Sequence, residues 1–186
     1  MRLAPGIAAA LLALATVTAK ADDGPVDVMV EIDGEIVRVE ASFHVSASAE
    51  ETWQVMTDFE HMAKFISNLK SSSILSQSGN TLTVTQKGEA SVGFLSFAFE
   101  STREIRLTPF ERIQSHMLSG NMKRYDGTTQ LTANGSGTHV QYHTEAVPNA
   151  WIPPVIGARF IENETREQLQ EMRNEILRRQ QQAAGK

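Results

Sequence analysis

The C-terminal part of the chain has an amphipathic helix pattern too long to be covered by one short helix. After Pro153 and Pro154, a helix is predicted from about Val155 to Arg179, about 25 residues that would span roughly 37 Å at ~1.5 Å per residue. The apolar positions recur at steps of three and four and lie on one face of this helix: Ile156, Phe160, Ile161, Thr165, Leu169, Met172 and Ile176. The opposite face carries two pairs in which an acid precedes a base by four residues, Glu162/Arg166 and Glu175/Arg179.

Most of the chain before this helix alternates as β-strands do, so the partner that we expect is a curved sheet. Val26 to Ile32 and Glu35 to Val45 alternate on either side of Asp33-Gly34, a typical hairpin turn. Ser48 and Glu51 form a capping box that opens the first of two predicted short helices, and about six further strands follow. The predicted fold class is α+β. The apolar residues of the two short helices are Trp53 and Met56, then Met62, Phe65 and Ile66.

Composition excludes several classes of function. A chain of 186 residues is predicted to form one domain with a sizeable core. The absence of cysteine excludes disulfides, thiolate metal sites and cysteine nucleophiles. A formal net charge of −5 without any basic run argues against nucleic acid or an anionic membrane as partner. Small apolar or neutral ligands remain.

Residues 1–21 have the pattern of a secretory signal peptide. Arg2 gives a positive end, Ile7 to Val17 is apolar, and Ala19-Lys20-Ala21 fits the small-x-small cleavage pattern. The alternative, a retained membrane anchor, is disfavoured because the apolar run is shorter than the ~20 residues that span a bilayer. Cleavage after Ala21 would change the net charge from −5 to −7, since it removes two basic residues and no acid. We therefore expect an exported protein, periplasmic in a Gram-negative source.

Four motifs lie at or near the junctions of the predicted elements. They are Phe43-x-Val45 before the Ser48-capped helix, Thr52 to Glu60 running into Phe65-Ile66, Arg124-Tyr-Asp-Gly127, and Trp151-Ile-Pro-Pro154. Together they resemble the helix-grip lipid-binding superfamily, also called SRPBCC or START-like, which includes START domains, the birch-pollen allergen and the polyketide cyclase/dehydrase and coenzyme Q-binding groups. The resemblance implies an antiparallel sheet of about seven strands wrapped around the long helix, with an apolar cavity between the two. Residues 22–35 would be an N-terminal extension or extra strand, 36–180 a START-like ligand-binding domain, and 181–186 a frayed tail.

The inward faces of the predicted strands favour a cavity, because they contain small or polar residues where a dense core would use branched or aromatic ones. At any single position, the small or polar residue could instead have a local structural role that does not require a cavity. Gly127 would then only allow a close helix approach, and the serines would bond to backbone. The residues concerned are Gly88, Ser101, Ser115, Gly127, Thr129 and Thr144.

Arg103 is the most informative of the predicted ligand-binding residues. An inward arginine on an apolar face is costly unless it meets a carboxylate, a phosphate, a carbonyl-rich ligand or an internal acid, and a one-residue bulge would instead turn it to solvent. Trp151 is either a pocket-mouth residue or a packing anchor, and Arg159 is a further candidate on the helix. The predicted set is Gln86, Phe97, Phe99, Ser101, Arg103, Ser115, Met117, Tyr125, Gly127, Thr129, Tyr142, Thr144, Trp151, Phe160 and Asn163.

The sequence contains no recognisable catalytic or metal-binding constellation. His139 and His143 on one strand would stand ~13 Å apart, too far to share an ion held at ~2.1 Å. A nucleophile elbow, paired inward carboxylates and a phosphate-binding loop are all missing from the pattern. No catalytic residue, metal or cofactor is predicted.

Three hypotheses follow. The leading one is an exported binder or carrier of a hydrophobic small molecule, a lipid, quinone or polyketide-like compound, with transient membrane contact left open. The second is a cyclase/aromatase-type enzyme, in which Tyr142, Tyr125 or Arg103 would polarise a carbonyl group. The third is a protein-interaction module with a filled pocket and an acidic face on the terminal helix. The sequence does not indicate the oligomeric state.

Overall fold

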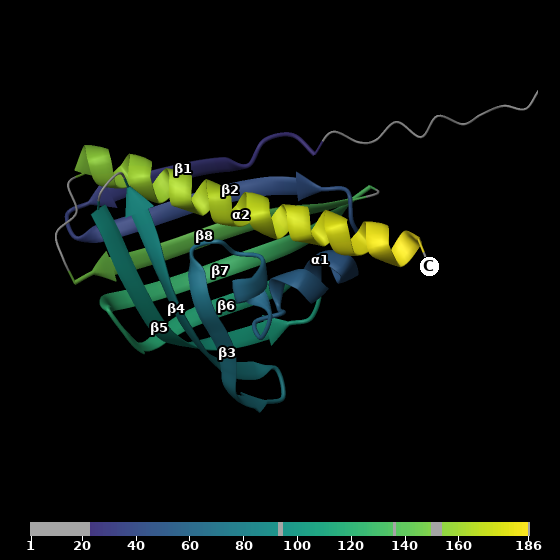
Figure 1. Ribbon diagram of the computed structural model, residues 1–186, viewed down its shortest axis with the longest axis horizontal. Coiled ribbons are helices and arrows are strands. Elements are labelled where there is room, and N and C mark those ends of the chain that lie inside the picture. The colour runs from purple at the N-terminus through teal and green to yellow at the C-terminus, as the bar shows by residue number, and fades with distance from the viewer. Residues whose placement is uncertain (1–22, 93–94, 136, 150–153, 186) are drawn as a thin grey trace, which may run out of the picture.

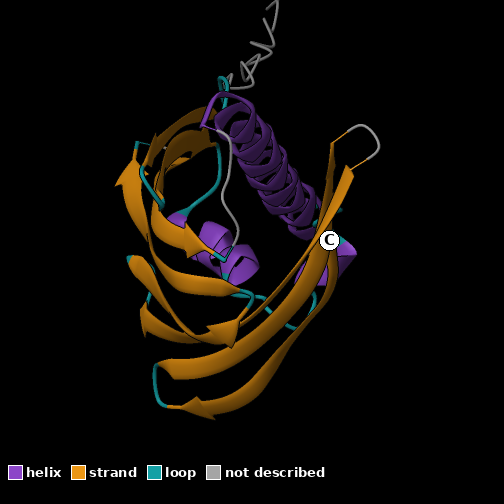
Figure 2. Ribbon diagram, turned by 90° about the vertical axis from the view of Figure 1, so that its left-hand side faces the viewer, coloured by secondary structure: helices purple, strands orange, loops and turns teal. Residues whose placement is uncertain are grey.

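Eight antiparallel strands form one strongly curved sheet in the computed structural model, which describes residues 23–92, 95–135, 137–149 and 154–185. Figure 1 shows the long helix α2 crossing the strands, and Figure 2 shows that the sheet curls while α2 lies along its open side. The strands are arranged in the order β1-β2-β8-β7-β6-β5-β4-β3. Their bounds are β1 (Asp27–Asp33), β2 (Ile36–Val45), β3 (Leu69–Ser78), β4 (Thr81–Val92), β5 (Leu95–Thr108), β6 (Arg112–Gly120), β7 (Met122–Asn134) and β8 (Gly137–Pro148).

The predicted helix-grip arrangement is confirmed, with one strand more than the seven that the resemblance implies. The additional strand is β1, which pairs with β2 from Asp27 to Asp33. Gly34 makes this hairpin possible, because its φ of 61° lies in the left-handed region that side chains disfavour. Residues 27–33 are therefore an edge strand of the sheet.

The segment between β2 and β3 contains α1 (Ala49–Met56) and one 3₁₀ turn, η1 (Met62–Lys64). The predicted capping box is present, since Ser48 accepts a bond from the Glu51 amide and Glu51 accepts one from the Ser48 amide. The second predicted α-helix is wrong. The amides of His61 and Lys64 each donate three residues back, which produces successive tight turns instead of a helix. These turns bring Phe59, Met62 and Ile66 into the core.

Helix α2 (Pro154–Ala184) packs on β1, β2 and α1. Leu169, Met172 and Ile176 are buried as the helical spacing predicts, but Ile156 at the start of the stripe is 69% exposed. The helix extends through Ala184, so residues 181–184 are helical where fraying is expected. No helix within the described ranges is both long and apolar enough to cross a bilayer.

The first described residues lie against α2. Arg173 of α2 is buried and donates to the carbonyl oxygens of Asp23 and Gly24, at 3.2 and 2.7 Å. Arg166 donates to the Val26 carbonyl oxygen at 3.3 Å, and the Val26 side chain is buried. Two arginines of the last helix thus bind the backbone that leads into β1.

Candidate ligand-binding site

A cavity of about 280 Å³ lies between the concave face of the sheet and the two helical segments. Its volume is near the lower end of the ~300–1,000 Å³ of ordinary small-molecule sites. The sheet contributes strands β3 to β8, α2 contributes one face, and the segment from Met56 to Asn68 contributes the remaining side. β1 and β2 take no part, because α2 packs directly on them.

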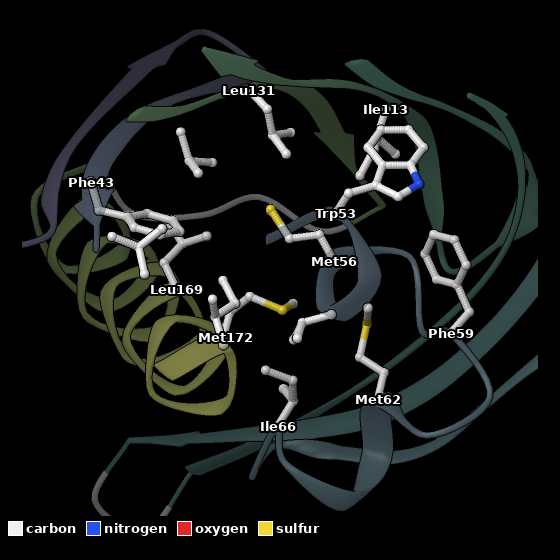
Figure 3. Close-up of a cluster of buried hydrophobic side chains, with 14 of the residues drawn as sticks. Phe43, Trp53, Met56, Phe59, Met62, Ile66, Ile113, Leu131, Leu169 and Met172 are labelled. Atoms are coloured by element: carbon white, nitrogen blue, oxygen red, sulfur yellow. The ribbon is translucent and has the colours of Figure 1, made fainter. Parts of the chain in front are cut away.

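The side of the cavity that the helical segments form is mostly apolar, with Asn68, Thr165 and Gln168 as its polar residues. Met56, Phe59 and Met62 from α1 and the loop after it line the cavity together with Leu169 and Met172 from α2, and Figure 3 shows all five in one buried cluster. Methionine side chains are flexible and polarisable, and they adapt to ligands of irregular shape. This side can therefore accommodate an apolar group without a fixed complementary shape.

Arg103 on β5 points into the cavity. β5 pairs with β4 without any register shift, so the alternation of β5 is intact and Arg103 keeps its inward position. The sheet does contain an irregularity beside Arg103, but it lies on β6, where Leu118 is left out of the pairing and is 55% exposed. The bulge is therefore on the neighbouring strand β6, and it does not turn Arg103 to solvent.

Neutral groups surround the Arg103 guanidinium. It donates to the Gln86 side-chain oxygen and, at 3.3 Å, to the Ser115 hydroxyl, and it lies 5.5 Å from the centre of the Tyr125 ring. Its Nε atom is buried and has no hydrogen-bond acceptor. Among the described residues that line the cavity, Arg103 is the only charged one.

Two tyrosine hydroxyls meet beside the guanidinium. Tyr125 and Tyr142 come from neighbouring strands, and their oxygen atoms are 3.1 Å apart. Burial, followed by the proximity of Tyr125, raises the pKa of the Tyr142 hydroxyl well above its ordinary value. Tyr142 therefore stays protonated, and the pair can present an O–H donor to a ligand.

Gly127 provides the space for this pair. A Cβ atom there would lie 3.1 Å from the Tyr125 hydroxyl and 3.2 Å from Cγ2 of Thr144. Its close neighbours are thus sheet residues, and the alternative that Gly127 serves a close helix approach is wrong. Gly88 differs, since a Cβ there would meet the Phe99 ring at 2.2 Å and the Asn68 carbonyl oxygen at 2.3 Å. Gly88 therefore lets the Phe99 ring and the Asn68 carbonyl oxygen pack against the backbone of β4, and it adds no volume to the cavity.

Strand alternation places most predicted residues in the cavity lining. Those on the lining are Gln86, Phe99, Ser101, Arg103, Ser115, Tyr125, Gly127, Thr129 and Tyr142. The lining residues of the helical segments were not predicted, although three of the seven methionines are among them and could have indicated the site. These are Met56, Met62 and Met172, and Met122 of β7 is a fourth methionine on the lining.

Five predicted residues lie outside the lining, which corrects the prediction for them. Asn163 is exposed, because it is two positions from the lining residue Thr165 and so about 200° around the helix. Phe97 is 51% exposed and contacts Phe160, with ring centres 5.6 Å apart. Thr144 is buried beside Gly127, and Met117 is partly buried but is not on the lining. Trp151 lies outside the described residues, and Arg159 is exposed.

Polar contacts join the segment between α1 and β3 to α2. Asn68 donates to Glu164 at 2.8 Å and accepts from Gln168 at 2.9 Å, and the Ser67 amide donates to Glu171 at 2.9 Å. Further along, Arg179 donates to Asp58 at 2.7 Å. This side of the cavity is therefore held together by hydrogen bonds and an ion pair in addition to apolar packing.

Two histidines of the outer face bond to acids. His116 lies 2.7 Å from Asp126 and His143 lies 2.5 Å from Glu40. Within the described ranges, no three side chains of His, Asp or Glu are placed to share a metal ion.

A curved antiparallel sheet, a long C-terminal helix and a cavity between them define the helix-grip class of proteins. The chain belongs to the family described as polyketide cyclase / dehydrase and lipid transport, whose model matches residues 45–173. No curated protein sequence matches the chain.

Three solved structures illustrate the shared fold. A STAR-related lipid transfer protein from Xanthomonas axonopodis has a TM-score of 0.69 and 13% identity, over 84% of this chain and 96% of that one. The Zhui aromatase/cyclase from Streptomyces sp. R1128 has a TM-score of 0.65 and 17% identity, over 77% and 95%. A START superfamily protein from Mycobacterium smegmatis has a TM-score of 0.63 and 16% identity, over 76% and 97%. At these identities the likeness concerns the fold alone.

Proposed function

We propose that this protein is an exported carrier that binds a hydrophobic small molecule, such as a lipid, quinone or polyketide-like compound, in the cavity between the sheet and α2. The observation that carries the proposal is the cavity, in which apolar helical segments face a polar group of strand residues. Small-molecule sites commonly combine these two kinds of surface. The family description includes lipid transport, and one structural neighbour is named a lipid transfer protein.

Export belongs to the same proposal. Removal of residues 1–21 would release the carrier into the periplasm, where a brief membrane contact would allow the ligand to enter or leave. Support comes from the basic, apolar and small-residue pattern of this segment. The N-terminal sequence of the protein secreted from its natural host, read by mass spectrometry, tests it, and an uncleaved N-terminus in the membrane fraction would refute it.

The first test of ligand binding is mass spectrometry of the protein purified without detergent, under native conditions and after organic extraction. A reproducible bound small molecule supports the carrier, and its mass gives the ligand class. The second test uses the neutral fluorophore N-phenyl-1-naphthylamine. Ser115→Phe should fill the cavity and abolish fluorophore binding, whereas Gln114→Phe places the same side chain on the outer face and should bind as wild type does. Equal binding by both folded variants would refute the proposal.

A second candidate function is catalysis of the cyclase/aromatase kind in the same cavity. The observation that favours it is the pair of tyrosine hydroxyls 3.1 Å apart beside Arg103, which are facing polar groups of the sort that carbonyl activation needs. In an aldol ring closure, an α-carbon would lose its proton and bond to the carbonyl carbon as the C=O π bond breaks. A tyrosine hydroxyl would donate its proton to the carbonyl oxygen, which becomes a hydroxyl, and the proton from the α-carbon would return through water to the tyrosine. Tyr142→Phe should then lose turnover of a poly-β-ketone but keep its binding. Full turnover in this variant would remove Tyr142 from the mechanism.

The third hypothesis, an interaction module with a filled pocket, requires a closed interior. The cavity of about 280 Å³ counts against it. A carrier and an enzyme both need this space, so the two tests above separate them from each other as well as from the interaction module.

A further inference from the structure

We infer that the ligand is a carboxylic acid with a single apolar body, whose carboxylate binds Arg103 while the apolar part lies against the methionines of α1, the following loop and α2. The inference deepens the proposed function and rests on it, because it names the class of ligand for the same cavity. Four features of the site lead to it, step by step: the charge of Arg103, the position of the nearby acids, the additional donors and the size of the cavity.

The first step is the charge of Arg103. Arginine keeps its proton under all ordinary conditions, so the guanidinium is a permanent positive charge. A charge withdrawn from water is costly unless an opposite charge and hydrogen bonds compensate it. The described residues that line the cavity contain no acid, and no ion pair of Arg103 is present among them. Gln86, Ser115 and the Tyr125 ring orient the guanidinium without neutralising it.

The second step is the position of the nearby acids. β5 carries Glu104 directly after Arg103, but the alternation of the strand places it on the outer face, where it pairs with Arg106 at 2.7 Å. On the outer face of β5, Glu104 is thus matched by Arg106, whereas Arg103 on the inner face has no acid among the described residues of the cavity lining. A bound anion would supply the countercharge that the chain itself places elsewhere.

The third step is the set of additional donors. The two tyrosine hydroxyls lie next to the guanidinium, since the Tyr125 ring contacts Arg103 and its oxygen is 3.1 Å from that of Tyr142. Hydroxyl donors strengthen the binding of a carboxylate oxygen without adding negative charge. The cavity therefore offers a carboxylate both a cation and an O–H donor within one group of side chains.

The fourth step is size. A volume of about 280 Å³ suits one short chain or one small ring system rather than a two-chain lipid. The lining from Met56 to Met62 and from Leu169 to Met172 is apolar, so the part of the ligand away from Arg103 must be apolar too. A medium-chain fatty acid and a small aromatic acid share this chemistry, and the carboxylate is the feature that Arg103 selects.

The experiment compares decanoate with methyl decanoate by isothermal titration calorimetry at pH 8, with the full chain freed of lipid. The two ligands share the apolar chain and differ in charge. Wild type should bind decanoate at least about tenfold more tightly, the discrimination typical of one charge-assisted hydrogen bond. Arg103→Gln should lose this preference by weakening decanoate at least about tenfold while changing the ester less than about threefold. Arg106→Gln, on the outer face of the same strand, is the matched control and should keep the preference.

Wild type that binds the ester as tightly as the acid overturns the carboxylate inference and leaves the carrier intact. Wild type that binds neither ligand nor the neutral fluorophore refutes the carrier, and the inference falls with it. If Arg103→Gln weakens both ligands equally, Arg103 acts on the structure and the inference fails. If Arg103→Gln does not fold, the acid-to-ester ratio of wild type and its decrease in Arg103→Lys decide the question.

Discussion

Two rows of side chains on the same concave face have opposite character. Phe43, Val140 and Leu131 lie opposite one another across β2, β8 and β7, and all three are almost fully buried. Four residues further along β7 and β8, Gly127 lies opposite Thr144 on one side and Ser115 on the other. The first row fills the space under α2, and the second leaves a cavity. Both rows cross β7 and β8, which pair without a register shift between the two rows, so the difference in side-chain volume contributes to the cavity.

The region in which α2 packs on the sheet, here called the packed region, should lose the most stability when a side chain is truncated. Ile176 of α2 is 1% exposed within this region, and its replacement by Ala should lower the free energy of unfolding by about 2–5 kcal/mol. Ile156 on the same helix is 69% exposed, and Ile156→Ala should change the free energy by less than about 0.5 kcal/mol. Urea denaturation measures both. Equal losses for the two variants would show that α2 does not pack on β1 and β2 as described.

Replacing a small side chain by a large one should destabilise the packed region more than the cavity, with a smaller difference in free energy than the truncations above. Ala41 of β2 is buried in the packed region, and Ala41→Leu should cost about 1–3 kcal/mol through overpacking. Ser115→Leu places the same side chain in the cavity, where it should cost less than about 1 kcal/mol. The two thermal midpoints compare these costs directly. A larger loss for Ser115→Leu would mean that the space beside Ser115 is not available to a side chain.

The smallest expected effect concerns the charged contacts between Asp58 and the end of α2, because they are only partly buried. Burial opposes ionisation of Asp58, but bonds from Arg179 and His61 outweigh it and lower its pKa. Bonds from Arg178 and Arg179 likewise lower the pKa of Glu175 despite burial. Lowered carboxyl pKa values give stability that is present above the unfolded-state values, about 3.9 and 4.3, and is lost as the pH falls through the folded-state values.

Stability should therefore decrease below about pH 5, and Arg179→Gln should reduce this acid dependence. Urea midpoints between pH 3 and 7 give the two slopes. Arg112→Gln removes an exposed cation for which the described residues provide no acidic partner, and it serves as the control with an unchanged slope. A slope for Arg179→Gln equal to that of wild type would show that these contacts do not contribute to folding.

Alternation along strands and helical spacing were sufficient to predict much of the fold. A period of two places Gln86, Arg103 and Tyr142 on the inner face whatever the sheet curvature, because each successive side chain changes face. The local capping box at Ser48 and the turn at Asp33-Gly34 depend only on neighbouring residues and are also confirmed. Such short-range patterns survive in any tertiary context.

The remaining features depend on contacts between distant segments. Asn163 was misplaced because helical spacing defines the faces of α2 but does not say which sector lies over the cavity. Phe97 has the inward alternation, yet it meets Phe160 away from the lining. The loop residue Phe59 belongs to a segment of tight turns without any period, so no pattern could assign it to the cavity. The meeting of Tyr125 and Tyr142 requires the register of β7 against β8.

The bonds from Arg166 and Arg173 to the backbone at residues 23–26 set an order of events for the growing chain. The donor and acceptor residues are up to 150 positions apart, so these contacts are among the longest loops that folding must close. During synthesis the N-terminus is made first, so β1 and the residues before it lack their partner α2 until nearly the whole chain has been made. High contact order of this kind slows folding. Completion of the native structure thus waits for the last helix.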